Sequence, residues 1–163
     1  MNSRRIAIID DDPFVVAYLR QAFGKHLPDV EVEGISEPVA PAGFDVYVVD
    51  REFDGEAQGR EVVHRIRAVA PQSLVIAYSA HLDREFLRSL LREGCAGAFD
   101  KGSLEELDNM IAIIADYLAT NTSENRVLRG FGETVRAISS LVREWNLRLA
   151  NNGRAEVKTF GDA

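Results

Sequence analysis

The sequence predicts an α/β fold in which a parallel sheet is covered by helices on both faces. Short apolar segments rich in β-branched residues alternate five times with segments whose apolar residues recur at helical spacing. Within the segment 44–49 the apolar run at 46–49 is continuous, which is typical of a strand buried on both faces. Together these two observations predict a doubly wound, five-stranded parallel sheet.

Each predicted strand is a short apolar segment that ends at a polar or glycine-containing loop. The strands are expected over residues 5–9, 30–35, 44–49, 74–78 and 96–99. The second of them alternates apolar and charged residues, so we expect it at an edge of the sheet.

The segments between the strands contain helix signals. Asp12 followed by Pro13 is typical of an N-cap and a first helical position, and this helix is expected to end near Gly24. Pro38 and Pro41 leave room for at most one or two helical turns before the third strand. The remaining helices are expected over residues 59–69, 82–93 and 103–118, and Ser103 is the expected cap of the last one.

Composition and charge exclude several classes of function. The 163-residue chain has no apolar run long enough for a membrane span or a signal peptide, so we expect a cytoplasmic protein with no membrane partner. Residues 1–121 hold 12 basic and 21 acidic side chains, which disfavours nucleic acid as a partner, while residues 122–163 hold 7 and 5. The single cysteine, Cys95, is expected to be structural.

Polar side chains follow four of the predicted strands. Asp10 and Asp11 follow the first strand, Asp50 the third, Ser79 the fourth and Lys101 the fifth. The carboxyl ends of parallel strands meet at one edge, so these side chains are expected to lie together. We expect Asp11 and Asp50 to hold Mg²⁺ directly and Asp10 through water, so that the Asp50 carboxylate can attack a phosphoryl group. Lys101 and Ser79 would then hold the other phosphoryl oxygens.

This arrangement resembles the receiver domain of two-component response regulators. The matching motifs are Asp10-Asp11-Asp12-Pro13, Val48-Val49-Asp50, Ser79-Ala80 and Lys101, and the resemblance covers residues 4 to about 121. It implies a flavodoxin-like fold with strand order 2-1-3-4-5. It also implies that Asp50 accepts a phosphoryl group from a histidine kinase or phosphotransfer protein. The Mg²⁺ ligands that it implies are Asp11, Asp50 and the backbone carbonyl of Glu52.

The chain departs from the receiver pattern at three positions. Glu52 places a negative charge two residues after the acceptor, and Gly102 stands where a proline commonly follows the lysine. Ala98 stands three residues before Lys101, where receivers often have an aromatic side chain that turns inward on activation. Two functions therefore stay open: a phosphorylatable receiver that signals through protein contacts, and a phosphorylation-independent adaptor or dimerisation scaffold. A phosphatase with an aspartyl nucleophile is disfavoured, because no aspartate stands two residues after Asp50.

Residues 122–150 predict an amphipathic helix. Its apolar residues recur at alternating intervals of three and four and form a heptad seam, made of Leu128, Phe131, Val135, Ile138, Val142, Trp145 and Leu149. This helix could fold back on residues 1–121, pair between two chains as a dimer, or dock in a groove of another protein.

Residues 151–163 contain two glycines and no periodicity, so they are predicted to be disordered. One helix and a short tail leave no room for a DNA-binding or separate catalytic domain. We therefore expect output through protein contacts. We expect no enzymatic activity beyond phosphorylation of the chain's own Asp50 and its slow self-dephosphorylation.

Overall fold

A computed structural model of the chain describes residues 3–121. Within these residues five strands alternate with four helices. The strands are β1 (Arg4–Ile9), β2 (Val30–Ile35), β3 (Val46–Val49), β4 (Leu74–Ser79) and β5 (Gly97–Asp100). The helices are α1 (Pro13–His26), α2 (Gly59–Val69), α3 (Arg84–Arg92) and α4 (Leu104–Thr120).

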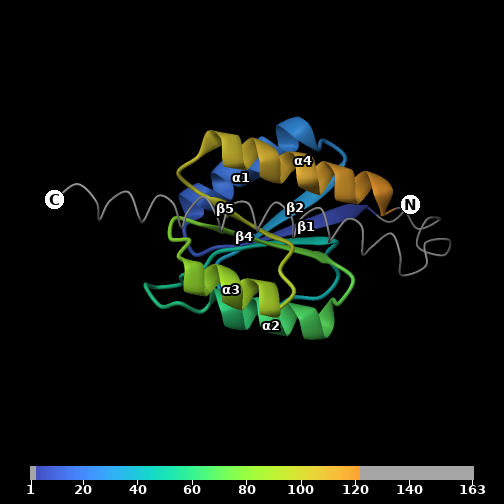
Figure 1. The fold of residues 1–163 in the computed structure, drawn as a ribbon. Helices are drawn as coiled ribbons and strands as arrows, with labels where there is room; N and C mark the ends of the chain where they lie inside the picture. Colours follow the sequence, from blue (N-terminus) through green and yellow to red (C-terminus); the bar gives the residue numbers. More distant parts are fainter. Residues whose placement is uncertain (1–2, 122–163) are drawn as a thin grey trace. The chain divides into compact units, whose positions relative to one another are not determined.

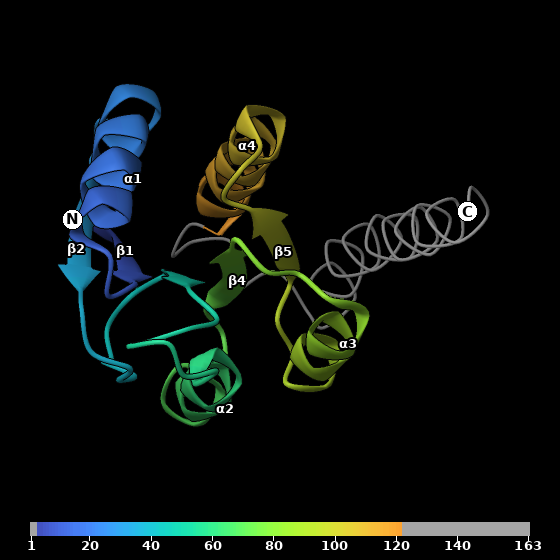
Figure 2. The ribbon, with the colours of Figure 1, turned by 90° about the vertical axis from the view of Figure 1, so that its left-hand side faces the viewer.

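The strands form one parallel sheet in the order β2-β1-β3-β4-β5. Helices α1 and α4 cover one face of this sheet, and α2 and α3 cover the other (Figure 1). Figure 2 shows the same three layers from the side. This is the predicted flavodoxin-like fold, and β2 lies at the predicted edge. The connections from β1 and β3 leave on opposite faces of the sheet (Figure 1), and in folds of this kind ligands bind at the carboxyl ends of the strands where this reversal occurs.

The central strands are buried on both faces. Every residue of β3 and β4 is buried, which explains why their apolar runs are continuous rather than alternating. On the α1 and α4 side, alternate strand residues join helix residues in one buried cluster that includes Ile8, Leu19, Val48, Ile76 and Ile114. The rigid sheet therefore positions the loops at its carboxyl edge.

Side-chain caps define the starts of three helices. Asp12 and Ser103 cap α1 and α4, as the sequence predicts, by accepting hydrogen bonds from backbone N–H groups in the first turn. Asp83 caps α3 in the same way, by accepting from the N–H of Phe86 at 2.7 Å. The cap places the start of α3 at Arg84, two residues after the predicted start.

Two further details differ from the sequence predictions, and a third agrees with them. Helix α1 continues past Gly24 to His26, because the buried side chains of Leu19 and Phe23 hold this part of the helix on the sheet. Leu104 matches the apolar spacing of α4 but is 72% exposed, since it lies in the first turn, beyond the edge of the core. Residues 36–45, which contain the two prolines, form bends and no helix, within the predicted limit of two turns.

In the described part of the chain, the helices are too short or too polar to cross a lipid bilayer. The predicted helix at 122–150 and the predicted disordered tail at 151–163 lie outside the described residues.

Gly59 places α2 close to the end of β3. Its N–H donates to the carbonyl of Arg51 at 2.8 Å. A Cβ at position 59 would overlap the carbonyl oxygen of Asp50 and lie 2.7 Å from the Cα of Arg51. Because these are backbone atoms, they cannot move aside without displacing Asp50 itself. Glycine is therefore required for this close packing.

We predict that Gly59→Ala lowers the free energy of unfolding by about 1–3 kcal/mol, because the added methyl group overpacks against backbone. Urea denaturation followed by circular dichroism measures this change. The matched control is Gly24→Ala, since a Cβ at position 24 meets nothing within 4 Å. That helical substitution should raise the free energy of unfolding by about 0.5–1 kcal/mol. Equal effects of the two substitutions would contradict the packing argument.

Candidate functional site

The loops at the carboxyl edge of the sheet bring the predicted site residues together. The backbone N–H of Asp10 donates to Ile35 of β2, and that of Asp50 donates to Ile9 of β1. In the same way the N–H of Lys101 donates to the carbonyl of Ser79 at 3.1 Å. Each of these residues therefore extends the sheet's hydrogen bonding by one position, and the rigid sheet fixes where its side chain begins.

Three carboxylates form a cluster at this edge. Asp10, Asp11 and Asp50 each offer an oxygen, and these oxygens all lie within 4.8 Å of one another. Asp10 is 2% exposed and Asp50 8% exposed, while Asp11 is half-buried. Buried carboxylates at this spacing repel one another, and a hard divalent cation offsets the repulsion. The donor set therefore fits Mg²⁺.

Backbone N–H groups orient these carboxylates. One oxygen of Asp10 accepts from the N–H of Asp12 at 3.0 Å, and one oxygen of Asp50 accepts from the N–H of Arg51 at 2.7 Å. Asp11 accepts from the N–H of Asp54 at 2.7 Å. Asp10 and Asp50 are thus each held at one oxygen by neighbouring backbone, and the other oxygen of each contacts Lys101. Asp11 is held instead by backbone of the loop after β3.

Lys101 bridges two of the carboxylates. Its Nζ lies 2.8 Å from Oδ2 of Asp10 and 2.9 Å from Oδ2 of Asp50. Burial raises the pKa of Asp10 above its ordinary value, and the hydrogen bond from Lys101 offsets only part of this. Burial would by itself lower the pKa of Lys101, but the hydrogen bonds to Asp10 and Asp50 outweigh it, so this pKa is raised.

Ser79 and Glu52 lie at the same edge of the sheet, Ser79 as the last residue of β4 and Glu52 in the loop after β3. Ser79 is 2% exposed, and its Oγ accepts from the backbone N–H of His81 at 3.4 Å. The Glu52 carboxylate lies 3.8 Å from Nδ1 of His81, and both of these side chains are largely exposed. The loop after β3 therefore meets the loop after β4 beside Asp50. All the site residues predicted from the sequence lie at this one edge, and their roles are proposed below.

A family model described as the response regulator receiver domain matches residues 6–112, about two thirds of the chain. The chain belongs to the response regulator receiver domain family. Members of this family are phosphoacceptor domains of two-component systems, and they bind Mg²⁺ in an acidic pocket. No curated protein matches the chain.

Solved receiver domains have the same fold. The signal receiver domain of the DNA binding response regulator merR from Colwellia psychrerythraea 34H is 22% identical with a TM-score of 0.58, and the match covers 69% of this chain and 98% of that one. The BeF3 activated receiver domain of DrrB is 18% identical with a TM-score of 0.61, covering 72% and 99%. A CheY-like receiver from Methanospirillum hungatei JF-1 is 18% identical with a TM-score of 0.58, covering 68% and 95%.

The position that often holds an aromatic residue in receivers is filled differently here. Ala98 is buried and has no ring to reorient, while the neighbouring Phe99 is 2% exposed and belongs to the core cluster with Leu107 and Met110 of α4. Adjacent strand residues point to opposite faces of the sheet, so Phe99 cannot stand in for an aromatic residue at position 98.

Gly102 supports the loop before α4. Its N–H donates to Oδ1 of Asp100 at 2.7 Å, a bond that the proline common in receivers could not make. The N–H of Asp100 donates in turn to the carboxylate of Glu106, one turn into α4. The loop is therefore held by hydrogen bonds of its own.

Arg51 connects the loop after β3 to the loop after β4 and to α3, which the sequence did not predict. Its guanidinium donates to the carbonyl of His81 at 3.1 Å and to the carboxylate of Asp83 at 2.8 Å. It also lies over the ring of Phe86, with its Cζ 4.9 Å from the centroid. The pKa of Asp83 is lowered because it accepts a hydrogen bond from the N–H of Phe86 and also pairs with Arg51. The residue after Asp50 is thus joined to the first turn of α3.

We predict that Lys101→Met lowers the free energy of unfolding by about 3 kcal/mol at neutral pH in metal-free buffer, because it leaves buried carboxylates without their cation. The folded-state pKa of Lys101 is raised, so its contribution is complete at neutral pH and is lost as the pH rises through that pKa. The difference from the wild type should therefore shrink above about pH 10.4. Urea denaturation across this pH range measures it.

The matched control is Lys25→Met, which removes the same charge from an exposed position in the last turn of α1. Its effect should stay below about 1 kcal/mol, the size of an interaction with the helix dipole. A Lys101→Met variant as stable as this control would contradict the assigned charge balance.

Proposed function

We propose that this receiver accepts a phosphoryl group on Asp50 from a phosphohistidine of a histidine kinase or phosphotransfer protein. The observation that supports this most directly is the position of Asp50. Its carboxylate lies at the end of β3 within the acidic cluster, 2.9 Å from the ammonium of Lys101. An ionised carboxylate held beside a fixed cation is prepared to act as a nucleophile toward an anionic phosphoryl group.

In the proposed transfer, an Asp50 oxygen forms a bond to phosphorus while the phosphorus–nitrogen bond to the donor imidazole breaks. The electron pair of the broken bond stays on the imidazole nitrogen, and Asp50 becomes an acyl phosphate. The Lys101 ammonium, a point charge, would pair with the phosphoryl oxygens. The Ser79 hydroxyl would donate a hydrogen bond to one of them. Hydrolysis of the acyl phosphate, carried out by the domain itself, would then end the signal slowly.

We propose that Asp11, Asp50 and the backbone carbonyl of Glu52 hold Mg²⁺, with Asp10 bound through water. Bound there, Mg²⁺ would neutralise the repulsion between the carboxylates and the incoming phosphoryl group. The Glu52 side chain adds a negative charge near this position, and its neighbour His81 stands beside it at 3.8 Å. We expect this pair to influence how long the phosphoryl group survives.

A phosphorylation-independent adaptor or dimerisation scaffold is the second candidate. The observation that favours it is the absence of an aromatic side chain at Ala98, together with the burial of Phe99 in the core cluster. A receiver without that aromatic switch could bind its partners in the same way whether or not Asp50 is modified.

Acetyl phosphate, a small phosphoryl donor, separates the two candidates. We predict that the wild type gains the mass of one phosphoryl group in the presence of Mg²⁺ and none in the presence of EDTA, as measured by intact-mass spectrometry. Asp50→Asn should gain none, because its amide is not a nucleophile. The matched control is Asp54→Asn, which removes a neighbouring charge and keeps the positive φ of 51° that asparagine tolerates. This control should gain one phosphoryl group.

An unmodified wild type under these conditions would refute the phosphoacceptor proposal. If Mg²⁺ binding were also absent by calorimetry, the adaptor would be the better description.

We further propose three parts in the chain: a receiver at 1–121, a partner-binding or dimerisation helix at 122–150, and a short disordered tail at 151–163. The heptad seam between Leu128 and Leu149 supports pairing between two chains. The excess of acidic side chains in residues 1–121 argues against nucleic acid as a partner. A cytoplasmic location agrees with a histidine kinase or phosphotransfer protein as the donor.

We predict that truncation after Asn121 lowers the number of chains per particle from two to one, because it removes the seam that joins two chains. Sedimentation equilibrium measures this number as the molar mass divided by the mass of one chain. A second variant, Leu128→Ala, shortens one side chain of the seam and should weaken the dimer without abolishing it. An unchanged number of chains per particle after truncation would exclude pairing through residues 122–150.

A further inference from the structure

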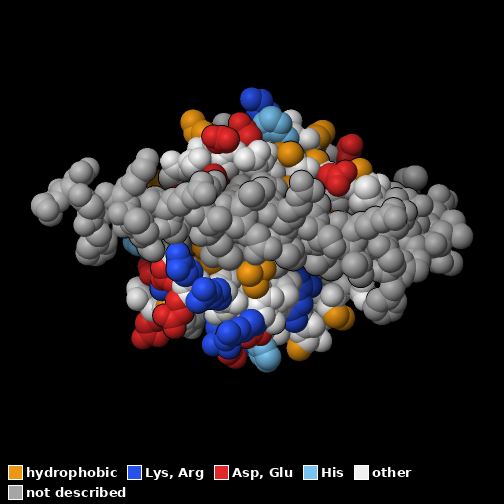
Figure 3. Space-filling view, in the orientation of Figure 1, with side chains coloured by type: hydrophobic (Ala, Val, Ile, Leu, Met, Phe, Trp, Pro, Cys, Tyr) orange, Lys and Arg blue, Asp and Glu red, His pale blue; other side chains and the backbone are white. Residues whose placement is uncertain are grey.

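Arginines gather on α3 and on the neighbouring helix α2. Arg84, Arg88 and Arg92 follow one another at intervals of four residues along α3 and therefore share one face of that helix. Figure 3 shows basic side chains gathered over the half of the molecule that holds α2 and α3. They border a hollow of about 460 Å³, which is lined by Arg60, Arg84, Glu85, Arg88, Ser89 and Arg92. We call these six residues the arginine surface.

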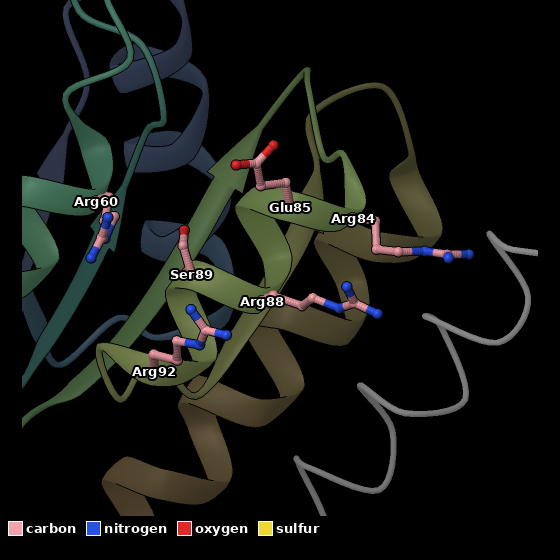
Figure 4. A pocket seen from close by; sticks show the side chains of 6 residues that line it. All are labelled: Arg60, Arg84, Glu85, Arg88, Ser89 and Arg92. Carbon is pink, nitrogen blue, oxygen red and sulfur yellow. The ribbon is translucent and has the colours of Figure 1, made fainter.

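Figure 4 shows how these side chains lie. Arg84 and Arg88 extend to the same side of α3, and Arg92 lies one turn further along the helix. Arg60 belongs to the adjacent helix α2 and lies across from Ser89. All four arginines are exposed, so their guanidinium groups can meet a partner without any rearrangement of the core.

The charges on this surface are only partly balanced. Arg60 pairs with Glu93 at 3.0 Å, and Glu93 also binds His64 at 2.8 Å, which leaves Glu93 no free oxygen. Across residues 3–121, neither Arg88 nor Arg92 has an ion-pair partner. Like charges one turn apart on a helix repel each other, and this repulsion is relieved when an anion binds between them.

We propose that the arginine surface binds an acidic segment of a partner protein, with carboxylates spaced about one helical turn apart. Four residues of α3 rise by about 6 Å, so the three arginines of this helix span about 12 Å. A helical partner with glutamate or aspartate at every fourth position has the same spacing. Guanidinium groups bind carboxylates through two parallel hydrogen bonds, which suits arginine better than lysine for this contact.

A carboxylate partner fits this surface better than nucleic acid does. A nucleic acid strand in a duplex has a phosphate every 3.4 Å or so, roughly twice the charge density of the arginine row. The excess phosphates would face acidic neighbours such as Asp83, Glu85 and Glu93. None of the six residues that line the hollow has an aromatic ring on which a base could stack.

The test uses the full chain and a fluorescent peptide of about four helical turns, with glutamate at every fourth position among uncharged helix-forming residues. A second peptide has glutamine at those positions. In fluorescence anisotropy the glutamate peptide should bind and the glutamine peptide should not. The double variant Arg88→Gln and Arg92→Gln should bind at least about tenfold more weakly, because two charge-assisted contacts are lost.

The matched control is the double variant Arg20→Gln and Lys25→Gln, which removes the same charge from α1 on the opposite face of the sheet. It should keep wild-type affinity. The α3 variant should keep the wild-type circular dichroism spectrum and melt no lower than the wild type, since like charges have been removed. This check separates lost binding from lost folding.

Failure of the glutamate peptide to bind would overturn the proposal, as would equal binding by the wild type and the α3 variant. Inorganic triphosphate or single-stranded RNA that binds more tightly than the glutamate peptide, and loses affinity in the α3 variant, would overturn it in favour of a phosphate site. The experiment needs neither Mg²⁺ nor a phosphoryl donor, so its outcome is independent of the phosphoacceptor proposal.

Discussion

The ammonium of Lys101, held between the carboxylates of Asp10 and Asp50, is the interaction on which the rest of the site depends. Three acidic side chains converge at the edge of a buried sheet, where their mutual repulsion and lost hydration both oppose folding. A fixed cation directly after β5 offsets part of that cost. The same arrangement leaves an ionised carboxylate beside a positive charge, so the feature that allows the acidic cluster to fold also prepares Asp50 for phosphoryl chemistry.

The acceptor strand is also connected to the neighbouring loop and helix. Arg51 joins the residue after Asp50 to the loop after β4 and to the cap of α3, through two hydrogen bonds and a contact with the Phe86 ring. The position of the common aromatic switch is filled by Ala98, so these contacts form the most direct observed connection from the acceptor to α3. Helix α3 in turn presents the arginine surface, which places a basic region one helix away from an acidic pocket.

Much of the fold and of the site could be predicted from the sequence because both depend on local patterns. Continuous apolar runs identify the buried strands, and the cap residues Asp12 and Ser103 identify two helix starts. The parallel order of the strands requires that the polar residues after them meet at one edge, which brings Asp50 and Lys101 together. Boundaries that depend on packing were predicted less well: α1 continues past Gly24 because buried side chains nearby outweigh the weak helix propensity of glycine.

The sequence by itself determined the sheet, the helix caps and the set of residues at its carboxyl edge, since these follow from apolar periodicity and from which residue ends each strand. Only the tertiary structure decided which side chains those residues contact. The contacts of Arg51 and the hollow beside Arg88 join segments about 30 residues apart, and no local pattern records which side chains will meet across such a distance. Packing of the helices on the sheet brings them together, because a side chain's partner is set by the space around it and not by its neighbours in the chain.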